Sequence, residues 1–158
     1  MLSRAELLRE LDRSYSRFAA EIEMLDDDQL EIVGVTRLWS MRDLLAHLIW
    51  WQTQMELRAA GRPVEWNPEP GESKEAYVDR LNAKAVEKAH HQSGRQVLEA
   101  FRASHAKMIE LASTLTDEQL SDERLMTPFG WDTYEHYDGH FESIRKFVTR
   151  HARRPSSG

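Results

Sequence analysis

The chain has 158 residues, a formal net charge of −6 and no cysteine. This length suits one domain with a single substantial core. The lack of cysteine excludes disulfides, thiolate nucleophiles and sulfur-ligated metal sites. The negative charge argues against a general nucleic-acid binder, which needs a basic surface. No apolar run approaches the roughly 20 residues of a membrane span, and the first residues are charged rather than signal-like. A cytoplasmic protein with no membrane partner is therefore expected.

Apolar residues recur at helical spacing along the first third of the chain. The stripe within residues 3–25 predicts a helix of about 22 residues. Ser3 and Glu6 are placed to form a capping box at its start. A second helix is predicted to begin after Ser40, with Asp43 in the partner position of another capping box.

The middle of the chain combines a long loop with further helical stripes. Residues 61–74 are rich in proline and glycine and predict a long loop, which either covers a site or is disordered; Trp66 within it favours a packed cover. A helix with a weak apolar face is predicted over 75–92, and one with a strong face over 97–115. Residues 116–120 resemble a turn or a single helical turn.

The last third predicts one more long helix. Residues 127–130 are expected to form an irregular lead-in, and Asp132 with Glu135 a capping box. Four long helices without strand patterning predict an all-α fold, a four-helix bundle with an elaborated crossover between the second and third long helices. The bundle is expected to span residues 1–152, followed by a disordered tail at 153–158.

Three histidines give the strongest functional signal. His136 and His140 are spaced i, i+4 and therefore point to the same side of their helix, one turn apart. His47 has a similar place beside the apolar stripe of the second helix. Neutral imidazoles on facing helices can hold a divalent cation and leave coordination positions free. The alternative is that the three are unrelated histidines at the edge of the core.

Other residues are candidates to line a pocket or to support the metal ligands. His105 lies inside an apolar stripe, where a histidine is more often a satisfied core residue than a partner of a metal ligand. Asp43 and Trp51 share a helix with the first histidine of the trio. Asp43, Glu135 and Asp138 are carboxylates near the histidines in sequence and could orient ligands or transfer protons.

Several segments resemble a known family. Trp-Ser-Met-Arg-Asp-Leu-Leu-Ala-His-Leu at 39–48 resembles the second-helix signature of the DinB-like superfamily. Four further segments are similar to its ClbS/DfsB branch, by their order and spacing: residues 81–84, 104–105, 115–120 and 133–137.

The resemblance implies a four-helix bundle in an up-up-down-down arrangement. Metal-binding DinB-like proteins hold a divalent ion with one histidine of the second helix and two of the fourth, which match His47, His136 and His140. Zinc or nickel is the expected ion, since all-nitrogen sites suit both. The ClbS branch is known for hydrolysing a reactive cyclopropane-bearing genotoxin without a metal. Because this chain keeps all three histidines, it departs from that pattern and favours a metal.

Three functions are consistent with these features. The first is a hydrolase that acts on a small reactive electrophile at the three-histidine metal site. The second is an S-transferase that uses a low-molecular-weight thiol such as bacillithiol or mycothiol, as other members do; the thiol would be a cofactor because the chain has no cysteine. The third is a non-catalytic small-molecule binding protein. A small-molecule substrate and a homodimer are the expected partners, and nucleic acid is not.

Overall fold

The computed structural model describes residues 2–62 and 67–152. Within them lie seven α-helices, one short 3₁₀ helix and no strand. None of these helices combines the length and apolar character needed to cross a membrane. The predicted cover formed by Trp66 and the predicted tail at 153–158 fall outside the described residues.

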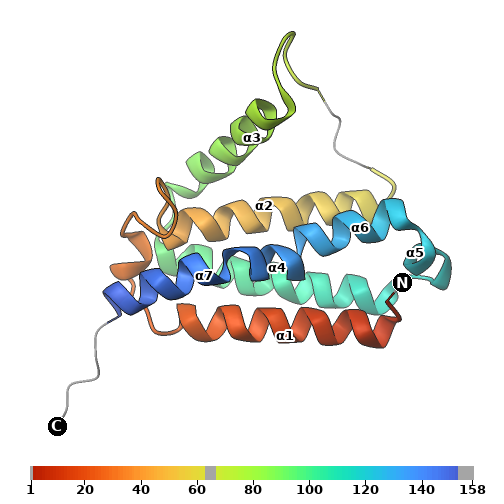
Figure 1. Ribbon diagram of the computed structural model, residues 1–158, viewed down its shortest axis with the longest axis horizontal. Helices are drawn as coiled ribbons and strands as arrows, with labels where there is room; N and C mark the ends of the chain where they lie inside the picture. Colours follow the sequence, from red (N-terminus) through yellow and green to blue (C-terminus); the bar gives the residue numbers. More distant parts are fainter. Residues whose placement is uncertain (1, 63–66, 153–158) are drawn as a thin grey trace.

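Four long helices form the bundle (Figure 1). They are α1 (Arg4–Ile22), α2 (Met41–Ala59), α4 (Gly94–Thr114) and α7 (Tyr134–His151). The shorter elements are the 3₁₀ helix η1 (Gln29–Glu31), α3 (Lys74–Ala89), α5 (Asp117–Ser121) and α6 (Glu123–Asp132). The single helical turn expected near residue 118 is α5, and the all-α bundle predicted from the sequence is confirmed.

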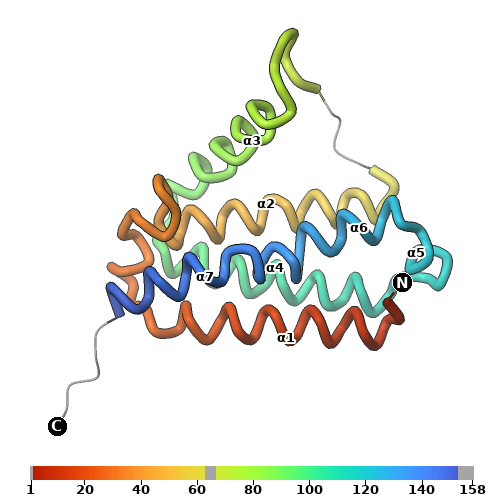
Figure 2. The backbone as a smooth tube through the Cα atoms, in the orientation of Figure 1, coloured from red at the N-terminus to blue at the C-terminus, as the bar shows by residue number. Residues whose placement is uncertain are grey.

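The path of the chain explains the arrangement of the four long helices (Figure 2). In chain order they run up, down, down and up, because the crossover through α3 returns the chain so that α2 and α4 are parallel. The single crossover between the second and third long helices gives this chain order, so the up-up-down-down order that the resemblance implied is wrong, while the all-α bundle itself is confirmed. Around the bundle the neighbours are α7, α1, α4 and α2. This order puts α2 and α7 side by side.

Local capping chemistry fixes where the first two long helices begin. The Ser3 and Glu6 capping box is present at the start of α1. At the start of α2, Ser40 Oγ accepts a hydrogen bond from the Asp43 amide at 3.2 Å, and the Asp43 carboxylate accepts one from the Ser40 amide at 3.0 Å. Each box satisfies amides that the first helical turn leaves without partners. The start of α2 in turn sets which face His47 occupies.

The segment before α7 differs from the prediction. The expected irregular lead-in at 127–130 is part of the helix α6, although it contains Pro128. Phe129 of this helix is fully buried in the core. The expected capping box of Asp132 and Glu135 is absent. Asp132 ends α6. Thr133 interrupts the helical backbone, with φ −129° and ψ −106°, and its hydroxyl donates a hydrogen bond to the Phe129 carbonyl at 2.6 Å. Burial of α6 outweighs the one hydrogen bond that proline removes.

The interior consists of two apolar clusters. One gathers residues of α1, α2, α4 and α7, including Phe18, Leu44, Phe101 and Phe147. The other lies toward α5 and α6 and contains Phe129. Tyr137 of α7 is fully buried in the first cluster. The histidines lie at the border of this cluster, between α2 and α7.

Candidate metal centre

His47 projects from α2 toward α7 and is 6% exposed. Aromatic rings of Trp39 and Trp51 flank it, with centroids 5.0 and 6.5 Å from the imidazole centroid. Both indoles are half-buried. His47 therefore lies between two aromatic side chains that part of a small molecule could also contact.

His136 and His140 project from α7 on one side, with ring centroids 5.1 Å apart. The adjacent Tyr137 is fully buried in the core. Its hydroxyl accepts a hydrogen bond from the Gln52 side-chain amide and donates one to His105 Nδ1 at 3.1 Å. Because Tyr137 is fixed in this way, the first turn of α7 cannot rotate freely, and His136 is held toward α2.

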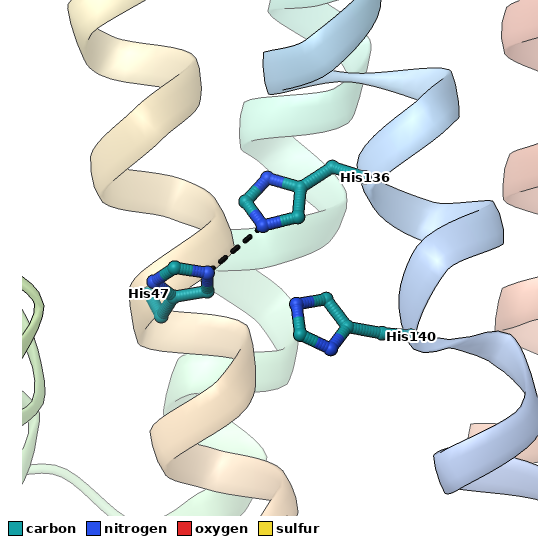
Figure 3. A group of neighbouring side chains, drawn as sticks. All are labelled: His47, His136 and His140. Atoms are coloured by element: carbon teal, nitrogen blue, oxygen red, sulfur yellow. Dashed lines mark hydrogen bonds between the residues drawn. The ribbon is translucent and has the colours of Figure 1, made fainter. Parts of the chain in front are cut away.

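The three imidazoles converge on a common point, as Figure 3 shows. One nitrogen from each of His47, His136 and His140 lies within 4.8 Å of the other two. The closest pair is His47 Nε2 and His136 Nε2, 2.9 Å apart. The structure thus brings together all three residues that the sequence singled out as ligands.

Burial keeps these imidazoles neutral. It lowers the pKa of His47 to about 4, assisted by the charge of His140, and the pKa of His136 to about 3, assisted by the other two rings. Burial also lowers the pKa of His140. A metal ligand must offer an unprotonated nitrogen, so at neutral pH these rings need not lose a proton to bind a cation.

The arrangement fits a small divalent ion. Nitrogen ligands lie 2.0–2.1 Å from zinc, so nitrogens within 4.8 Å of one another can reach one ion through small side-chain rotations. His136 Nδ1 is buried and has no hydrogen-bond partner among the described residues. That orphaned atom marks the ring as one whose bonding is incomplete in the protein alone.

A residue that the sequence did not single out completes the site. Asn82 of α3 places its side-chain oxygen 2.9 Å from His47 Nδ1 and 3.0 Å from Trp51 Nε1. Trp51, a predicted pocket residue, is therefore linked to His47 through Asn82. The only sequence signal for Asn82 was its place in the family-like segment 81–84, and that segment did not predict which residues Asn82 contacts.

His105 has the core role that its position favoured. Its ring stacks on Tyr15 with centroids 3.6 Å apart, and burial lowers its pKa to about 4. Its hydrogen bond goes to Tyr137. It reaches the site indirectly, because Tyr137 is the neighbour of His136.

The nearby carboxylates serve other contacts. Asp43 caps α2 and lies 3.3 Å from His90 Nε2, and no hydrogen bond or ion pair in the described part of the chain joins it to the three histidines. Asp138 forms an ion pair with Arg13 of α1 at 2.7 Å. Asp132 is different: burial raises its pKa to about 7, against the charge of Arg58. It can exchange a proton near neutral pH.

Comparison with known proteins agrees with this architecture. The sequence profile of the DinB superfamily matches residues 10–141. The chain belongs to the DinB superfamily. No curated protein sequence matches this DinB protein significantly.

Solved structures share the DinB bundle. DfsB, described as a sibling lethal factor precursor, has a TM-score of 0.78 and 18% identity, over 95% of this chain and 97% of that chain. The colibactin self-resistance protein ClbS, solved with double-stranded DNA, has a TM-score of 0.75 and 16% identity, over 92% of this chain and 94% of that chain. An uncharacterised Escherichia coli protein has a TM-score of 0.74 and 18% identity, over 94% of both chains. At these identities the likeness shows a common fold.

Proposed function

We propose that this DinB protein is a metal-dependent hydrolase of a small reactive electrophile, with zinc or nickel held by His47, His136 and His140. The observation that carries the proposal is the convergence of three neutral imidazoles from α2 and α7. A divalent ion bound there supplies Lewis acidity and a water whose pKa is lowered toward about 7. Three protein ligands leave room for a substrate, unlike the four of a closed structural site.

The surroundings of the ligands favour a small and partly apolar substrate. Trp39 and Trp51 flank His47 and remain half-buried, so their exposed faces can contact apolar atoms of a bound molecule. The fold is shared with a colibactin self-resistance protein. The self-resistance role of that protein supports a reactive small molecule as the substrate class proposed for this chain.

The test is incubation of the zinc-loaded protein with an epoxide and with an activated ester, followed by mass spectrometry. We expect at least one product that gains one water, and we expect none above background from His140→Ala or from chelated wild-type protein. His151→Ala is the matched control, because His151 lies at the other end of α7, with its ring 4.3 Å from the Phe147 ring.

Other products would overturn the proposal in favour of a different function. A product that carries an added low-molecular-weight thiol, formed only when that thiol is supplied, would identify an S-transferase. A ligand that raises the melting temperature but is recovered unchanged would identify a binding protein.

A further inference from the structure

We propose that Asn82 is a positioning residue that holds His47 in one tautomer, with Nδ1 protonated and the Nε2 lone pair directed at the histidine cluster. The inference rests on the proposed metal site for its functional meaning. Asn82 comes from α3, the crossover helix, and not from the four helices that form the bundle. The packing of α3 against α2 therefore decides, through Asn82, which nitrogen of His47 is free to bind a cation.

The donor and acceptor inventory determines the tautomer. An indole N–H can only donate, so the Asn82 atom 3.0 Å from Trp51 Nε1 must be the amide oxygen. The same oxygen lies 2.9 Å from His47 Nδ1. An amide oxygen can only accept, so His47 Nδ1 must donate. A neutral imidazole carries one N–H, and Nε2 is therefore the unprotonated nitrogen.

This tautomer suits the rest of the cluster. His47 Nε2 lies 2.9 Å from His136 Nε2, so in the metal-free protein His136 Nε2–H donates to the His47 lone pair. His136 Nδ1 is then an acceptor without a partner among the described residues. For His47 and His136 to hold a cation between them, the His136 proton would have to sit on Nδ1 instead of Nε2. Both Nε2 lone pairs would then be free for the ion, with no net loss of protons.

Without Asn82, His47 could adopt the opposite tautomer. Its Nε2 would then carry a hydrogen directed at His136, and no acceptor would hold the His47 proton on Nδ1 when a cation needs the Nε2 lone pair. Partners that orient a metal-bound histidine are typically worth 10–100-fold in metal affinity. We expect a loss in this range when the amide is removed.

The experiment compares wild-type protein with Asn82→Ala, Asn82→Asp and Lys84→Ala. Lys84 is exposed on α3 and is the matched control. Long-range ¹H–¹⁵N spectra of metal-free protein at pH 7.5 report the His47 tautomer, assigned by its absence in His47→Gln. Competition with a chromogenic chelator reports zinc affinity.

We expect the Nδ1–H tautomer in wild type and Lys84→Ala, and its loss in Asn82→Ala together with 10–100-fold weaker zinc binding. Asn82→Asp should restore the tautomer, because a carboxylate accepts from both Trp51 and His47. Retention of the Nδ1–H tautomer in Asn82→Ala, or its absence in wild type, would overturn the inference. If wild type binds no zinc, the proposed function fails, while the spectra still decide the role of Asn82.

Discussion

At the scale of single residues, His47 is buried and His136 is half-buried, and their Nε2 atoms lie 2.9 Å apart. Burial disfavours the charged form of each ring, and the neighbouring imidazoles add to this effect. A cationic imidazole at this spacing would also repel the metal. Both effects keep protons off the ring nitrogens, as the proposed metal site requires.

The lowered pKa values predict an unusual pH dependence of metal binding. Protons compete with the ion only below the pKa of a ligand, which is about 4 for His47 and about 3 for His136. We therefore expect zinc affinity to change less than threefold between pH 8 and pH 6 and to fall steeply only below about pH 4. Chelator competition at successive pH values measures this. A tenfold loss between pH 8 and pH 6 would show ordinary, solvated histidines.

The sequence predicted the site unevenly at this scale. The three histidines could be found because i, i+4 spacing and position beside an apolar stripe depend only on helix geometry. Asn82 could not be found, because its contact with His47 depends on how α3 packs on α2. That packing joins residues 35 positions apart.

At the scale of elements, the placement of α7 decides the geometry of the centre. The break at Thr133 separates α6 from α7, and Tyr137 anchors the first turn of α7 in the core. The capping boxes of α1 and α2 were predictable, because they need only residues three apart. The helix α6 was not, because burial of its apolar residues overrode the proline and turn signals in its sequence.

Two glycines in long helices predict opposite effects on stability. A Cβ at Gly94, at the start of α4, would lie 2.6 Å from the Cβ of Leu30 in η1, whereas a Cβ at Gly139 of α7 would meet nothing within 4 Å. We expect Gly94→Ala to lower the free energy of unfolding by about 1–3 kcal/mol through overpacking. Gly139→Ala should raise it by up to about 1 kcal/mol through helix propensity.

Denaturant unfolding of the two variants beside wild type measures both effects. Each variant adds the same methyl group to a helix, so the two serve as mutual controls. Stabilisation by Gly94→Ala would contradict the close approach of η1 and α4.

At the scale of the whole molecule, the fold brings α2 and α7 together although their histidines are 89 positions apart in sequence. The four long helices could be predicted from periodicity alone. Their spatial order could not, since it depends on the crossover through α3 (Figure 1). A metal ion at the centre would join the second and last bundle helices, and α3 would be linked to it through Asn82.

The most direct test of the account is the zinc content of tag-free protein after loading and exhaustive dialysis, measured by elemental mass spectrometry. The account predicts one ion per chain for wild type and less than a tenth of that for His136→Ala. It predicts one ion per chain for His91→Ala, a change on the exposed surface outside the centre. Wild-type protein without zinc, or His136→Ala with as much zinc as wild type, would contradict the assignment of the three histidines as a metal centre.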